Sequence, residues 1–188
     1  MTSPNQSPSI DSWLDDVLER ATVKVRPRKV APIEDENVQK MFPSDRLYDI
    51  SFATWPVAPR LPKQLSHEMI ARVRDQESIE TIRDEETLRS FLAQTLTDIR
   101  DEDGARAAAL ASLRLAEAVA EAGSYRFDEP DVTVVRQDDN IVATAQAAAC
   151  NPAQGEVAVR LEFGADGRIK PDAIEIDDRS RRGPPGGS

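Results

Sequence analysis

Cysteine and histidine are nearly absent from this 188-residue chain, which has one of each, Cys150 and His67. A single cysteine cannot form an intrachain disulfide, which favours a reducing compartment, so we expect a cytoplasmic protein. One histidine and one cysteine cannot supply the three or four ligands of a zinc site. A Ser-His-acid or Cys-His catalytic centre would have to use His67, and no neighbouring residue indicates one.

Glycine-rich loops and long apolar runs are missing as well. The densest glycine cluster is the Gly186-Gly187 pair of the tail, which precedes no helix that could hold a phosphate. No apolar run approaches the roughly 20 residues of a membrane-spanning helix. The N-terminal region also lacks the charged and apolar parts of a secretory signal. The sequence therefore predicts no cofactor, no metal, no catalytic residue and no membrane span.

Basic residues are fewer than acidic ones, 24 against 34, so the formal net charge is -10 and the pI is near 4.7. Ten acidic and three basic residues lie between Asp75 and Gly104. Such a surface repels phosphate backbones, so nucleic-acid binding is not expected. A solvated helical face explains the excess. An inhibitor that presents this surface to a basic protein is the alternative.

The first ordered element that the sequence predicts is a short amphipathic helix near residues 10–20. Its apolar residues follow helical spacing and share one stripe: Ile10, Trp13, Leu14, Val17 and Leu18. Acidic residues surround the stripe, and Ser12 followed by Asp15 is typical of a helix start. Helices this short are marginal alone, so the stripe needs a cover. It docks into the groove of a partner, or it packs on the chain's own core.

The remaining chain divides into regions of different composition. Residues 1–32 are expected to form a flexible arm that carries the helix, and residues 33–80 a proline- and aromatic-containing segment that wraps the surface and contains a helix. A compact α+β domain is expected over 81–178, followed by a disordered tail over 179–188. Within the wrapping segment we expect a helical turn over 35–42 and a helix that carries Met69, Ile70 and Val73.

The predicted domain consists of helices followed by strands. Helical spacing indicates one helix after Asp84, and alanine-rich composition indicates another over 105–122. Alternation from Val132 onward predicts three or four antiparallel strands, with a hairpin at Gly164–Gly167 and an edge strand beyond Pro171. The fold class is therefore α+β, with two or three helices packed on a three- to four-stranded antiparallel meander.

These observations favour a non-enzymatic protein-interaction module such as an adaptor, assembly factor or accessory subunit. Its partner is another protein, and the residues of the apolar stripe bind it. One alternative is a small ligand-binding or catalytic domain with a pocket between helices and sheet. The small residues Ala143, Ala145, Ala147 and Ala149 would leave room for that pocket.

Overall fold

The computed structural model describes residues 9–53, 60–75, 78–120, 127–149 and 155–179. The helices in these ranges are α1 (Ile10–Arg20), α2 (Glu36–Met41), α3 (Glu85–Thr95) and α4 (Glu102–Val119). One antiparallel sheet contains β1 (Lys29–Pro32), β2 (Arg46–Ser51), β3 (Glu68–Asp75) and β4 (Ser78–Ile82). A second contains β5 (Asp131–Gln137), β6 (Asn140–Ala148), β7 (Glu156–Phe163) and β8 (Ile169–Asp178).

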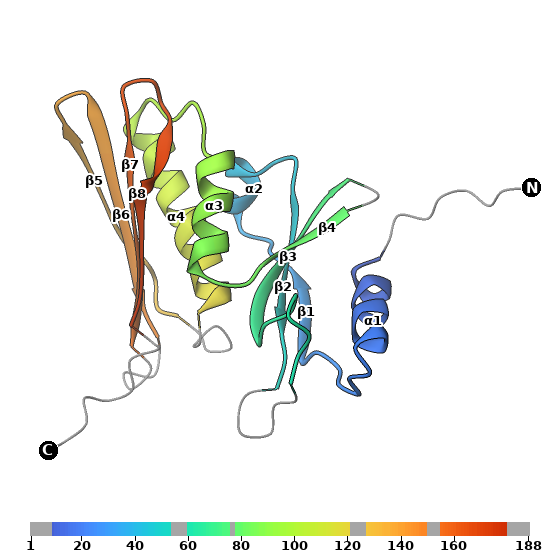
Figure 1. Cartoon of the computed structure of the whole chain (residues 1–188). Coiled ribbons are helices and arrows are strands. Elements are labelled where there is room, and N and C mark those ends of the chain that lie inside the picture. The colour runs from blue at the N-terminus through green and yellow to red at the C-terminus, as the bar shows by residue number, and fades with distance from the viewer. Residues whose placement is uncertain (1–8, 54–59, 76–77, 121–126, 150–154, 180–188) are drawn as a thin grey trace, which may run out of the picture.

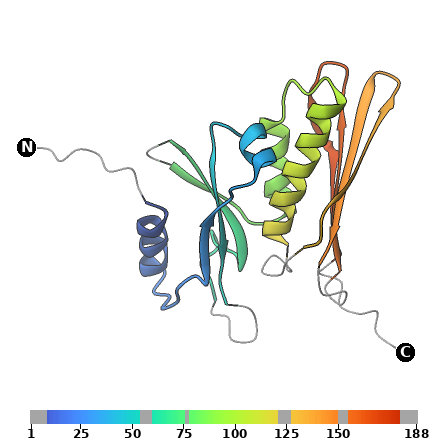
Figure 2. The same ribbon diagram turned by 180° about the vertical axis from the view of Figure 1, so that it is seen from behind.

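These elements stack in four layers (Figure 1). Helix α1 lies outside the first sheet, α2 to α4 lie between the two sheets, and the second sheet closes the other side; the view from behind shows the same order (Figure 2). The α+β class is confirmed, with a second sheet beyond the predicted one. Residues 1–8 of the predicted arm, Cys150 and, except for Arg179, the predicted tail over 179–188 fall outside the described residues.

The second sheet is the predicted meander, with strands paired in chain order. The hairpin at Gly164–Gly167 is confirmed: the Gly164 amide donates to Arg168 O at 2.9 Å, and Gly167 has φ +75°. Glycine suits this turn because a Cβ at Gly167 would meet the backbone of the α3–α4 connection at 3.0 Å. Strand β8, which contains Pro171, lies at the sheet edge as expected.

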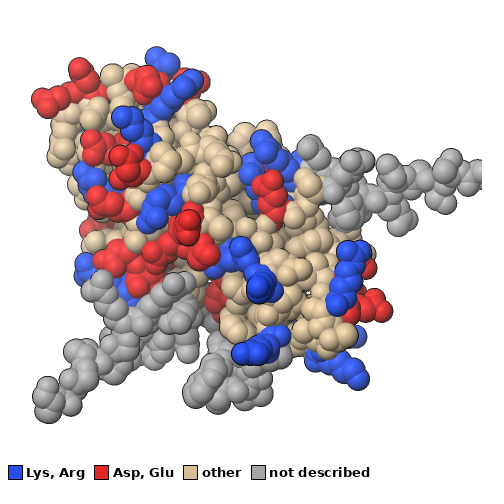
Figure 3. All heavy atoms as spheres, in the orientation of Figure 1, with Lys and Arg blue, Asp and Glu red and all other residues tan. Residues whose placement is uncertain are grey.

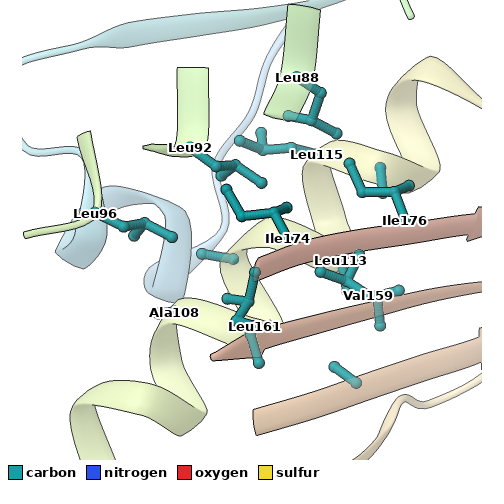
Figure 4. Close-up of a cluster of buried hydrophobic side chains, with 14 of the residues drawn as sticks. Leu88, Leu92, Leu96, Ala108, Leu113, Leu115, Val159, Leu161, Ile174 and Ile176 are labelled. Carbon is teal, nitrogen blue, oxygen red and sulfur yellow. The ribbon is translucent and has the colours of Figure 1, made fainter. Parts of the chain in front are cut away.

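The main core lies between the two sheets. Leucines of α3 meet the inward residues of β7 and β8, with α4 alongside (Figure 4). Ala143, Ala145 and Ala147 of β6 are buried against α4, so these small side chains admit the helix rather than line a pocket. The same core continues to the inner face of the first sheet through Leu47, Ile70 and Ile82 of β2, β3 and β4.

The helix predicted around Met69, Ile70 and Val73 is wrong, because these residues form β3. Met69 and Val73 point to the outer face of the first sheet, whereas Ile70 joins the inner core. A strand covered on both faces has apolar residues on both sides, so its sequence does not alternate. The helical turn over 35–42 is confirmed as α2, which begins where the Asp35 side chain accepts from Val38 N at 3.0 Å.

Candidate functional site

The predicted partner-binding stripe lies on the chain's own first sheet in this structure. Ile10, Leu14 and Leu18 of α1 are buried, at 8%, 2% and 5% exposure. They pack in one cluster with outer-face residues that include Phe52 and Met69, both fully buried. In the isolated chain these three residues therefore pack on the protein's own sheet.

Trp13 and Val17 lie at the side of this contact and are only half-buried. The acidic residues around the stripe are exposed: Asp11, Asp15, Asp16 and Glu19. The stripe residues thus separate into three that the sheet covers and two that remain partly accessible. An indole that is partly accessible beside a buried stripe suits a contact with a second surface.

Packing of apolar side chains, rather than hydrogen bonding, holds α1 on the sheet. Within the described residues its hydrogen bonds are local: Ser12 N donates to Ser9 Oγ at 3.1 Å, and Val23 N donates to Leu18 O at 3.0 Å. An extended segment then leads to β1. In it Val23 and Val25 are half-buried, and Lys24, Arg26 and Arg28 are exposed. The helix is thus joined to the sheet by side chains and by one short connection.

A second candidate site lies between the layers, where the inner faces of β1 and β2 meet α4. We name this cavity of about 330 Å³ the inter-layer pocket. Its polar lining comes from β1, α2 and its cap, β2, α4 and the residues before β5: Lys29, Asp35, Asn37, Asp49, Arg114, Glu117 and Asp128. Its apolar lining comes from α4 and the same β5 connection: Leu110, Leu113, Phe127 and Pro130.

The most buried charged residue of the inter-layer pocket is Asp49, a carboxylate that is 3% exposed on the inner face of β2. Lys29 Nζ donates to its Oδ2 at 2.6 Å, and an Arg114 guanidinium nitrogen lies 3.6 Å from the same oxygen. A buried carboxylate needs such compensation. Asp49 is thereby neutralised from two different layers of the fold.

Glu117 follows Arg114 by three residues, so both lie on the same side of α4. Burial raises the pKa of the Glu117 carboxyl from its ordinary value of 4.5 to about 7, against the opposing effect of the Arg114 charge. Asp35 adds a smaller effect in the same upward direction. A titratable group in a cavity with an elevated pKa is typical of binding sites.

Replacing Glu117 with glutamine is expected to stabilise the protein at pH 8 and to change little at pH 4.5. Because the folded pKa is raised, the carboxyl contributes stability below pH 4.5 that is lost as pH rises through 7. This pKa shift corresponds to a gain in unfolding free energy of at most about 3 kcal/mol at pH 8. Solvent screening of the partly exposed carboxyl reduces that gain. Urea unfolding of both proteins at the two pH values measures it; an equal difference at both values would contradict the assignment.

Neither the sequence stripe nor the charge count identified the inter-layer pocket. Single residues did indicate it. Side chains alternate between the two faces of a strand, so Asp49 shares a face with the buried Leu47 and lies toward the core. Between Ala111 and Val119, Arg114 and Glu117 interrupt a stretch of α4 that is otherwise buried. Charged residues at core positions indicate a polar site inside a fold.

The acidic excess between Asp75 and Gly104 has a partly structural origin. Glu85 and Glu86 occupy the first turn of α3, and Glu102 and Asp103 the first turn of α4. Negative side chains there complement the helix dipoles. On the face seen in Figure 3, acidic side chains gather mainly over the half of the molecule that holds the second sheet.

Within the described ranges, no three His, Cys, Asp or Glu side chains are arranged as a metal site. In the same part of the chain, no helix combines the length and the apolar composition needed to cross a bilayer. Comparison of the chain with protein-family models, with curated proteins and with solved structures gives no match.

Proposed function

We propose that the protein is a non-enzymatic protein-interaction module, of the adaptor, assembly-factor or accessory-subunit kind, whose helix α1 docks into a groove of another protein. The observation that carries this proposal is the mode of attachment of α1. Its stripe of Ile10, Leu14 and Leu18 rests on the first sheet through apolar contacts, while Trp13 stays half-exposed. A cytoplasmic location, which the single cysteine favours, fits this role.

The free energy that holds α1 on the sheet is modest. Each buried Ile or Leu contributes about 1.5 to 3 kcal/mol. Ordering an isolated helix of this length opposes that gain, because such helices are marginal in water. Release also exposes Phe52 and Met69, so a partner must bind α1 more tightly than the sheet does.

The side chains of α1 define the partner's chemistry. The apolar stripe needs a groove lined by aliphatic or aromatic side chains, as the outer face of the first sheet provides in the free chain. Four exposed acidic residues surround the stripe, which favours a basic rim on that groove. The partner is thus a protein with an apolar, basic-rimmed groove.

Trp13→Ala is the test variant, because Trp13 contributes to a partner contact more than to the intramolecular one. We expect the free energy of unfolding to fall by about 1 kcal/mol or less, since the indole is only half-buried in the free chain. Affinity for the partner is expected to fall about 30-fold, as for a dominant interface tryptophan. Asp16→Glu, on the exposed side of the same helix, keeps the negative charge; it is the matched control and should retain both properties.

The measurement has two steps. Full-length wild type, Trp13→Ala and Asp16→Glu are used for affinity capture from native lysate, and proteins lost with Trp13→Ala alone are purified. Each is then titrated with a peptide of residues 9–21 and with its Trp13→Ala form. Identical captured sets for all three proteins would overturn the proposal. Affinity that collapses with added salt would favour the acidic-inhibitor alternative instead.

A further inference from the structure

We propose that the inter-layer pocket binds a small organic cation, an ammonium or guanidinium group on an aliphatic stem, with Glu117 as its counter-charge. This site is separate from α1 and goes beyond the interaction role above. The argument uses the charges that line the cavity, its apolar wall and its size.

The charge of Asp49 is already balanced inside the protein. Lys29 and Arg114 both lie near its Oδ2, at 2.6 and 3.6 Å, and the Arg114 charge also opposes the raised pKa of Glu117. Glu117 makes no hydrogen bond and no ion pair with any described residue, although it lines the same cavity. A partly buried carboxyl that makes no hydrogen bond or ion pair favours an incoming cation.

A neighbouring group strengthens the preference for positive charge. Asp35 also lines the cavity and adds negative potential at Glu117. These carboxyl groups do not form a metal-ligand set. The cation expected here is therefore an organic one, which needs only one or two acceptors.

The apolar lining of the pocket indicates that the ligand also has an apolar part. Leu110 and Leu113 of α4 line the cavity, as do Phe127 and Pro130 on the chain segment before β5. The cavity of about 330 Å³ is at the small end of ligand pockets, which begin at about 300 Å³. A short aliphatic stem with one charged end matches this combination of wall and counter-charge.

Binding of a cation is linked to loss of a proton from Glu117. Burial holds the pKa of this carboxyl near 7, so part of the population is protonated at neutral pH. The groups that face it are Arg114 on its own helix, Lys29 on β1, Asp49 on β2, Asp35 before α2 and Asp128 before β5. A bound cation stabilises the carboxylate, so affinity should be about tenfold higher at pH 8 than at pH 6.

Calorimetric titration of the full-length protein with agmatine and with n-butylamine tests the proposal, with n-butanol as the neutral control. We expect saturable binding of the amines alone, stronger at pH 8 than at pH 6. Glu117→Gln should weaken it at least tenfold and remove its pH dependence. Glu102→Gln, an exposed change on the same helix, should leave it unchanged. Leu110→Trp, which fills the cavity without changing charge, should also abolish binding.

The two possible sources of the cation are separated by one further probe. An acetylated arginine amide that binds as well as agmatine identifies the side chain of a protein or peptide as the source. Binding of agmatine alone identifies a free small molecule. No saturable binding of any amine at about 10 mM, or equal binding by Glu117→Gln, overturns the proposal. Trp13→Ala should bind agmatine like wild type, which keeps this result independent of α1.

Discussion

Replacing Arg72 with alanine is expected to lower the free energy of unfolding by about 3 to 5 kcal/mol. Arg72 lies in the middle of β3 on the inner face of the first sheet and is 4% exposed. Its Nε and one terminal nitrogen donate to the two carboxylate oxygens of Asp45 at 2.8 and 3.3 Å. The other terminal nitrogen donates to Glu80 at 3.2 Å.

The loss is large because the substitution leaves a buried charge without its partner. The side chain of Asp45 is 7% exposed, so water cannot replace the guanidinium. Arg72 also lies 4.8 Å from the ring centroid of Phe91 in α3, and the truncation removes that contact between sheet and helix layer. The Arg72 side chain thus connects β3 with β4, with the turn before β2 and with helix α3.

Arg160→Ala is the matched control for Arg72→Ala. Arg160 also contacts two carboxylates, Glu162 and Glu175, each at 3.3 Å, but these pairs lie on the solvent side of the second sheet. Exposed pairs of this kind contribute about 1 kcal/mol or less. Urea unfolding at pH 7 measures both variants. Similar losses for the two arginines would show that burial does not control the strength of the Arg72 contacts.

A double variant separates the lost partner from the lost contact. Arg72→Met with Asp45→Asn removes both charges and keeps most of the volume, so the pair of changes is expected to cost less than Arg72→Ala alone. The cost of this double variant is compared with the summed costs of Arg72→Met and Asp45→Asn alone. If the two are equal, Asp45 finds another partner or reaches water once Arg72 is replaced. The cycle therefore isolates the interaction energy between Arg72 and Asp45.

Local patterns in the sequence were sufficient to predict the helices and strands that bury only one face. The stripe of α1 and the alternation of β7 each identify a single buried face, and Gly167 marks the turn that joins β7 to β8. Asp84 correctly indicates the start of α3, whereas α4 begins at Glu102, before the expected residue 105. In all these cases the information lies within a few residues of the element.

The first sheet could not be predicted in this way, because its strands are covered by α1 on one face and by α2 to α4 on the other. Strand β3 therefore has Met69 and Ile70 buried side by side on opposite faces. The inter-layer pocket depends on still longer separations, since Lys29 of β1 and Glu117 of α4 line one cavity although they lie far apart in the chain. Amphipathicity showed that α1 needs a cover, but periodicity carries no information about which surface provides it.

Truncating Leu92 to alanine is expected to lower the free energy of unfolding of the whole chain by about 3 to 5 kcal/mol. Leu92 is fully buried between α3 and the second sheet, among the leucines and isoleucines of Figure 4. The void that remains cannot close without moving α3 or β8, so the cost includes lost contacts as well as lost burial. This residue belongs to the unit that unfolds cooperatively.

Leu14→Ala makes the same chemical change at a residue that is almost as buried, 2% exposed, yet its cost is expected to be smaller. The loss cannot exceed the free energy that holds α1 on the sheet, because the helix can separate while the inter-sheet core stays folded. Hydrogen exchange measured by mass spectrometry distinguishes the two cases. Leu14→Ala should accelerate exchange in residues 10–20 alone, whereas Leu92→Ala should accelerate it in α3, α4 and β6–β8 together. Equal losses and global acceleration for Leu14→Ala would make α1 part of the core and remove the physical basis for its exchange with a partner.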